Sequence, residues 1–288
     1  MLGPAVQPGP LNTPKPRFFR PMHVDVADLR DFYATPLGLV ARRLLVHRIR
    51  ARWRGLHGKT LIGLGFATPY LGGFRGEVAR LGALMPAGQG ALVWPLDGRI
   101  MSALVEEDRL PLADNSVDRL LLVHCLEVAE RVGPVLREMW RVMAPEGRLL
   151  IVVPNRRGVW ARLDTTPFGH GRPYSRSQLA SLLEQSLFTP IDWAGALFLP
   201  PFGTRMLLRS AMAWERMGAR LWPAFGGVLI VEARKELTAT IGKPAKARAI
   251  RELVTVRRDP ASAPHTRSRS HPSRAQDHDR VRPTQSDA

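Results

Sequence analysis

The 288-residue sequence has a single cysteine, Cys125, and few lysines, five among its 42 basic residues. One cysteine forms no internal disulfide, and without a Cys/His cluster there is no zinc-binding pattern, so a reducing compartment is the simplest environment. Long apolar runs are also lacking. The longest stretch without a charged residue, Leu81 to Leu96, has sixteen residues, five of them Gly or Pro. A membrane-spanning helix needs roughly 20 mostly apolar residues, so we expect a cytoplasmic protein with no membrane insertion.

Acidic residues are scarce relative to basic ones, 25 against 42, which gives a formal net charge of +17. Residues 1–21 have three basic and no acidic side chains, and residues 245–288 have ten basic and five acidic ones. The part between them keeps 29 basic and 20 acidic residues. A basic surface favours anionic partners, but an arginine excess of this kind can equally reflect coding composition. The charge is therefore only weak evidence for a nucleic-acid partner, which stays possible but is not favoured.

The composition divides the chain into three parts. Residues 1–21 contain six prolines and no periodic pattern, which is typical of a disordered arm. Residues 22–244 have the apolar content and the length of one α/β domain. Residues 245–288 are basic and poor in large apolar side chains, so most of this tail cannot offset its ordering entropy.

Strand-like and helix-like segments alternate within residues 22–244, which predicts an α/β, doubly wound, mostly parallel sheet. The expected strands are Thr60–Gly63, Val78–Met85, Met101–Val105, Arg119–Cys125, Arg148–Val153 and Val228–Ala233. The expected helices are one or two over Asp28–Arg50, one around Val135–Met143, and two over Ser175–Ser186 and Thr204–Trp222. In such sheets ligands bind beyond the C-terminal ends of the strands, near the switch point of the strand order.

Three segments carry candidate chemistry. The first strand enters a loop of small residues, Gly63, Gly65 and Ala67. Small residues allow a ligand to approach the backbone closely, and nearby helix-terminal N–H groups favour an anionic group. The alternative is a tight turn with nothing bound. An acidic segment, EEDRLPLADNSVD at 106–118, offers carboxylates after a strand, or a merely solvated loop. The third segment, residues 136–155, places one helix, one turn and one strand.

Taken together and in this order, the three segments resemble the class I S-adenosylmethionine-dependent methyltransferases, in particular their small-molecule group. The resemblance lies in LPLADNSVD at 110–118, LEV at 126–128 and REMWRVMAPEGRLLIVVPN at 137–155. It implies a Rossmann-like sheet of seven strands, a site for S-adenosylmethionine, and methyl transfer to a small-molecule substrate.

The resemblance also implies roles for single residues. The glycine loop would lie under the methionine and ribose of the cofactor, Glu106 would face the adenine amine, and Val123 and His124 would lie where methyl donor and substrate meet. The residues implied for the cofactor are Gly63, Gly65, Ala67, Met85, Glu106, Glu107, Asp108, Leu110 and Val123.

Two departures from the family pattern bear on the cofactor. Leu61 and Met85 stand where the family usually has acidic residues, and each lost charge-assisted hydrogen bond is worth about 1.5–3 kcal/mol. Either Glu107 or Asp108 supplies a substitute acceptor, or the chain is a degenerate relative with a binding or regulatory role. An RNA methyltransferase is a weaker alternative that only the basic tail supports.

Candidate substrate-side groups are His124 and the loop residues His170, Arg172 and Tyr174. Histidine titrates near neutral pH, so His124 or His170 can act as a general base. Tyr174 and Arg172 could fix a polar or anionic acceptor. For each residue taken alone, simple packing or capping is the more frequent role, and Cys125 is expected to be buried in its strand.

Overall fold

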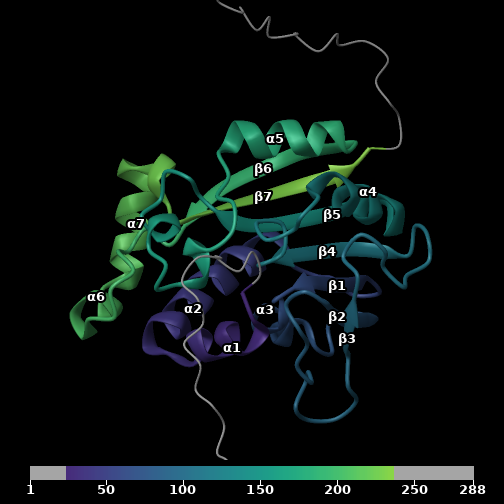
Figure 1. Cartoon of the computed structure of the whole chain (residues 1–288), viewed down its shortest axis with the longest axis horizontal. Coiled ribbons are helices and arrows are strands. Elements are labelled where there is room, and N and C mark those ends of the chain that lie inside the picture. Colours follow the sequence, from purple (N-terminus) through teal and green to yellow (C-terminus); the bar gives the residue numbers. More distant parts are fainter. Residues whose placement is uncertain (1–23, 237–288) are drawn as a thin grey trace, which may run out of the picture. The chain divides into compact units, whose positions relative to one another are not determined.

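The structure is a computed structural model that describes residues 24–236. The expected arm at 1–21 and tail at 245–288 lie outside the described residues. Seven strands form one sheet in the order β3-β2-β1-β4-β5-β7-β6 (Figure 1). The strands are β1 Thr60–Gly65, β2 Arg80–Pro86, β3 Ser102–Val105, β4 Val117–Val123, β5 Met143–Pro154, β6 Phe188–Ala196 and β7 Val228–Lys235.

All pairings among the first five strands are parallel, and β7 runs antiparallel to both of its neighbours, β5 and β6. This confirms the expected seven-stranded, mostly parallel, Rossmann-like sheet. The order reverses between β1 and β4, so the switch point lies at the C-terminal ends of these two strands.

One strand, β6, is absent from the sequence-based expectation. It lies at the edge of the sheet, and its ladder shifts register between Pro190 and Asp192. Its middle residues are half-buried or exposed, so it lacks the continuous apolar run that marked the central strands. Edge strands tolerate proline because one of their sides needs no partner.

Seven α-helices accompany the described sheet. They are α1 Val26–Ala34, α2 Pro36–Arg52, α3 Thr68–Leu71, α4 Val132–Val142, α5 Arg176–Gln185, α6 Arg205–Arg209 and α7 Ala211–Leu221. The expected helix over Thr204–Trp222 is divided at Ser210 into α6 and α7. The capping box of α5 is confirmed, because Ser175 and Gln178 exchange side-chain and backbone hydrogen bonds.

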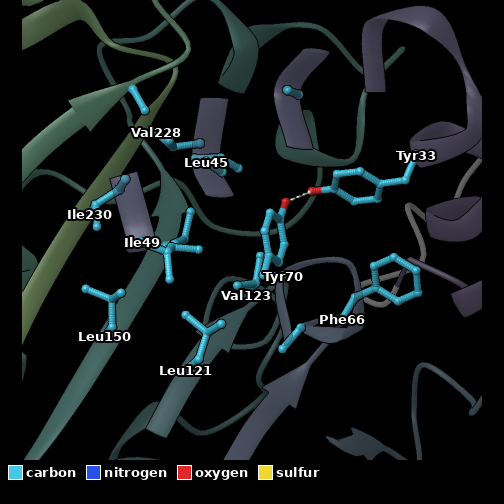
Figure 2. Packing of buried hydrophobic residues seen from close by; sticks show 14 of the residues in the cluster. Tyr33, Leu45, Ile49, Phe66, Tyr70, Leu121, Val123, Leu150, Val228 and Ile230 are labelled. Atoms are coloured by element: carbon cyan, nitrogen blue, oxygen red, sulfur yellow. Dashed lines mark hydrogen bonds between the residues drawn. The ribbon is translucent and has the colours of Figure 1, made fainter. Parts of the chain in front are cut away.

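Two apolar layers enclose the sheet. On one face, α1, α2 and α3 pack against the central strands, and Figure 2 shows Leu45 and Ile49 of α2 facing Leu121, Leu150 and Ile230. On the other face, residues of α4 and α5 cover the alternate side chains of the same strands. Burial on both faces fixes the register of β1 and β4, and with it the geometry of their ends.

The ends of β1 and β4 approach so closely that only glycine fits. Gly65 has a φ of +83°, and a Cβ there would lie 2.2 Å from the Val123 carbonyl oxygen and 2.8 Å from the Cys125 Cβ. The next residue, Phe66, donates its N–H to the same Val123 oxygen at 2.8 Å. The glycine is therefore required by the fold itself.

Replacing Gly65 with alanine should destabilise the protein, since it adds a backbone clash to a φ that L-residues rarely adopt. We expect Gly65→Ala to lower the free energy of unfolding by at least about 1–3 kcal/mol, measured by denaturant titration. Gly72→Ala is the matched control, because nothing lies within 4 Å of its added Cβ, and its effect should stay within about 0.5 kcal/mol. Equal stabilities for the two variants would contradict the close approach.

Candidate functional site

A buried network of polar side chains lies at the switch point. The hydroxyl of Tyr33 in α1 is 2.6 Å from the Tyr70 hydroxyl of α3 and 2.9 Å from Nε2 of His124, which follows β4. Figure 2 shows the two tyrosines pointing toward each other. His124 Nδ1 lies 3.3 Å from Oε1 of Glu127. The network thus joins a helix from the N-terminal part of the chain to the loops after β1 and β4.

Glu127 is the unusual member of this network. It is 2% exposed, and neither carboxylate oxygen has a hydrogen-bond partner among the described residues. A buried carboxylate without hydrogen bonds is costly, so its retention calls for a partner. Its backbone carbonyl oxygen accepts the Arg172 backbone N–H at 2.7 Å, which fixes the loop but does not involve the carboxylate.

Burial controls the protonation of the tyrosines in this region. Desolvation raises the pKa of Tyr33 well above its ordinary value, and the nearby Tyr70 and the charge of Glu127 raise it further. Both tyrosine hydroxyls therefore stay protonated at neutral pH. Each can donate one hydrogen bond and accept another, as a proton-conducting chain requires.

Aromatic rings close over the network. The Phe66 ring stacks on Tyr33 with centroids 5.6 Å apart. Phe168, in the loop after β5, lies 4.7 Å from the His124 ring and 5.6 Å from Trp160. These contacts bring the Gly- and Pro-rich loop of residues 165–174, expected to lie on the substrate side, to the end of β4.

The expected glycine loop is filled by protein atoms. A Cβ on Gly63 would lie 2.6 Å from the Ala67 Cβ and 2.8 Å from a methyl of Leu71. Gly63 and Ala67 are thus small so that α3 can pack on β1. The assignment of Gly63, Gly65 and Ala67 to a cofactor stays a prediction, since their size has a structural cause.

Leu61 and Met85, which replace the usual acidic residues, lie in an apolar region that one polar side chain, Gln89, crosses. Leu61 and Met85 are fully buried, and Met85 Sδ accepts the Leu92 N–H at 3.1 Å. Gln89, in the loop after β2, is 4% exposed and donates its side-chain amide to the His124 carbonyl. Because β1 lies between β2 and β4, this carboxamide spans the C-terminal end of β1.

The three acidic candidates after β3 differ in their surroundings. Glu106 is exposed, and exposed Asp108 pairs with Arg131 at 3.3 Å. Glu107 is half-buried. Burial raises the pKa of the Cys125 thiol, and the charges of Glu127 and then Glu107 add to the rise. Glu107 is thus the acid of this segment whose field reaches the loop after β4.

Leu110, the first residue of the expected Leu-Pro pair, has a structural setting. Its side chain is buried, and its N–H donates to Oε1 of Glu138 in α4 at 2.6 Å. Glu138 in turn pairs with Arg141. Leu110 therefore helps anchor the acidic segment to α4, and its contact with a cofactor stays a prediction.

The candidate catalytic residues are only partly brought together. Val123 and His124 lie at the end of β4, in the network. The Tyr174 hydroxyl donates to the Leu126 carbonyl at 3.0 Å, which places it against the Glu127 loop. His170 is half-buried, with Nδ1 3.1 Å from the Thr166 carbonyl. Roles for His170 and Tyr174 in catalysis stay predictions.

Sequence reasoning missed Tyr33, Tyr70 and Gln89 as site residues. The sequence has only three tyrosines, and all three are buried, so their scarcity was one clue. Tyr70 lies in α3, directly after the small-residue loop of Gly63, Gly65 and Ala67. Tyr33 comes from a helix that precedes the first strand, so only the folded chain shows its place.

Comparisons with known proteins agree with this fold. The family model for a methyltransferase domain matches residues 94–151. Over these residues the chain is similar to the methyltransferase-domain family. No curated protein sequence matches the chain.

Solved methyltransferase structures have the same fold at low sequence identity. A Thermotoga maritima S-adenosylmethionine-dependent methyltransferase, a possible histamine N-methyltransferase, is 13% identical with a TM-score of 0.51, over 73% of this chain and 96% of that one. A chain from the complex of the Haloferax volcanii Trm112 methyltransferase activator with the putative methyltransferase is 17% identical with a TM-score of 0.53, over 74% and 97%. At these identities the likeness concerns the fold alone.

The hydrogen bonds of this buried network can be tested by a double-mutant cycle. Tyr33→Phe removes the partner of both His124 and Tyr70, and we expect it to lower the free energy of unfolding by about 1–3 kcal/mol. Tyr70→Phe should cost less, because Tyr33 keeps its bond to His124. The loss of unfolding free energy in the double variant should be smaller than the sum of the two single losses by about 0.5 kcal/mol or more. Strict additivity in denaturant unfolding would show that the hydroxyls are not coupled.

Proposed function

We propose that the protein transfers a methyl group from S-adenosylmethionine to a small-molecule acceptor, at the network formed by Tyr33, Tyr70, His124 and Glu127. The observation that carries the proposal is the buried Glu127 carboxylate, whose oxygens lack hydrogen-bond partners among the described residues. It lies at the switch point of a methyltransferase sheet, where such sheets bind their ligands.

The chemistry of the side chains fits the cofactor at its cationic end. S-adenosylmethionine carries an ammonium and a sulfonium, and Glu127 is a buried carboxylate without hydrogen bonds among the described residues, whose one close polar neighbour there is His124 Nδ1. At the ribose, the carboxamide of Gln89 and the half-buried Glu107 are the polar groups available in place of the absent acids. When bound, the cofactor supplies an electrophilic methyl group.

The protein's own residues would position the acceptor and manage its proton. Methyl transfer needs an aligned approach of the nucleophile, so orientation accounts for most of the rate. His124 can take a proton from the acceptor at Nε2, in exchange for its bond to Tyr33. Glu127, beside Nδ1, would stabilise the resulting imidazolium, and the rings of Phe66 and Phe168 keep water away.

One specific observation favours a second function, a methyltransferase-fold protein that binds a ligand or partner without turnover. The Gln89 side chain reaches from the loop after β2 to the His124 carbonyl after β4, and buried Leu61 and Met85 offer no acidic group there. Val26 at the start of α1 also donates its N–H to the Gln89 carbonyl at 2.8 Å. In this arrangement the ribose position is closed by the protein.

Calorimetric titration with S-adenosylmethionine and S-adenosylhomocysteine distinguishes the two functions. We expect micromolar affinity for S-adenosylmethionine, since Glu107, Gln89 and Glu127 replace part of the lost contacts. Glu127→Gln keeps the shape of the side chain but removes its charge, so affinity should fall about 10- to 100-fold, the value of one charged hydrogen bond. S-adenosylhomocysteine lacks the sulfonium charge and should be less sensitive to this change.

The matched control is Glu130→Gln, three residues further along and exposed, which should bind both ligands like the parent protein. Denaturant unfolding of Glu127→Gln checks that the variant folds, so that a loss of affinity is not a loss of structure. Absence of binding heat up to millimolar ligand in the parent protein would refute the proposed methyl transfer and favour the non-catalytic function.

A further inference from the structure

Away from the switch point, the segment containing α6, α7 and the 3₁₀ helix Pro223–Phe225 exposes many large apolar side chains. Figure 1 shows α6 and α7 at one end of the sheet, beyond the helices that cover it. The exposed apolar residues are Phe202, Met206, Met212, Met217, Leu221, Trp222 and Phe225. Met206 in α6 is 84% exposed. We call this set the α6–α7 surface.

Every exposed charge of this segment is positive. Between residues 200 and 227 the basic side chains are Arg205, Arg209, Arg216 and Arg220, all exposed. The single acid, Glu215, is 4% exposed; it accepts the Phe198 N–H at 2.7 Å and lies 3.8 Å from Arg48 of α2. No acidic side chain of residues 200–227 is therefore exposed.

The neighbouring helix extends the positive region. Arg48 of α2 reaches Glu215 of α7, so the two helices lie side by side. From residue 32 to residue 76 the sequence contains no acidic residue. Beside α7, α2 therefore adds the partly exposed Arg48 and no negative charge.

The exposed side chains belong to a firmly packed segment. Ala211, Glu215 and Gly218 form the buried face of α7, and a Cβ on Gly218 would lie 2.4 Å from the Phe198 Cβ. The helix is therefore held against the strand region by a close contact that needs glycine. Its apolar outer residues are a fixed feature of the folded surface.

We propose that the α6–α7 surface binds an anionic lipid bilayer, with α6 and α7 lying along the interface. Large apolar side chains enter the boundary between headgroups and acyl chains, and arginines beside them pair with lipid phosphates while their stems stay in contact with the apolar layer. Trp222 has the amphipathic ring that is enriched at this depth. No described helix is long and apolar enough to cross a membrane, so the contact is peripheral.

Charge excludes the other occupants of this surface. A second copy of the chain would bring arginines against arginines. The chain's own ends, residues 1–21 and 245–288, are themselves basic. A nucleic acid would pair with the arginines but would leave exposed Met206 and Leu221 without an apolar environment. The inference is independent of the proposed methyl transfer, since it uses none of the switch-point residues.

The test is flotation of the full chain with vesicles. We expect binding to vesicles of phosphatidylcholine with phosphatidylglycerol and little binding to phosphatidylcholine alone. Arg205→Gln with Arg209→Gln should weaken binding by roughly fivefold for each arginine replaced. Arg80→Gln with Arg99→Gln is the control of equal charge, at two exposed arginines elsewhere on the domain, and should leave binding within about twofold of the parent's.

Apolar insertion is tested in the same way. Met206→Ser with Leu221→Ser should weaken binding to the anionic vesicles, while Leu96→Ser with Ile100→Ser, which changes two exposed residues elsewhere, should not. Circular dichroism and unfolding confirm that the variants fold. Equal losses for surface and control variants, no binding to anionic vesicles, or a dimer in sedimentation that Met206→Ser dissolves would each overturn the proposal.

Discussion

The hydrogen bond from the Phe66 N–H to the Val123 carbonyl, at 2.8 Å, is the contact on which the site depends. It joins the end of β1 to the end of β4, and it forms only because Gly65 lacks a side chain and adopts a positive φ. The chain then turns sharply after both strands. This turn directs His124 toward Tyr33 and brings the Tyr70 hydroxyl from α3 into the same buried space.

The network that results combines well-paired groups with one poorly paired group. Tyr33 forms hydrogen bonds with both Tyr70 and His124, as buried polar groups usually do. Glu127 beside them has the His124 Nδ1 contact at 3.3 Å but, among the described residues, no hydrogen bond to either carboxylate oxygen. Proteins carry such local costs mainly where function requires them. The contrast within one cluster is the reason to place the ligand at Glu127 rather than at the loop where the backbone is tight.

The central part of the fold could be predicted from the sequence because its determinants are local. Continuous apolar runs marked β4 and β5, the capping box at Ser175 marked the start of α5, and glycine marked the turn after β1. Edge strand β6 could not be found in this way, since the residues between its two buried ends are half-buried or exposed and form no apolar run. Its pairing depends on β7, about forty residues further along the chain.

The candidate site was less predictable, because its residues meet only through the sheet. Glu127 lies in a segment that the family resemblance includes, but its lack of hydrogen bonds is a property of the folded chain. Gln89 could not be inferred, since its role arises from the position of β1 between β2 and β4. Glycines at 63 and 65 pointed to a ligand, yet both are explained by packing. The fold requires the small residues Gly63 and Gly65, but it does not by itself explain the buried Glu127 carboxylate. That carboxylate is therefore the stronger indication of a ligand.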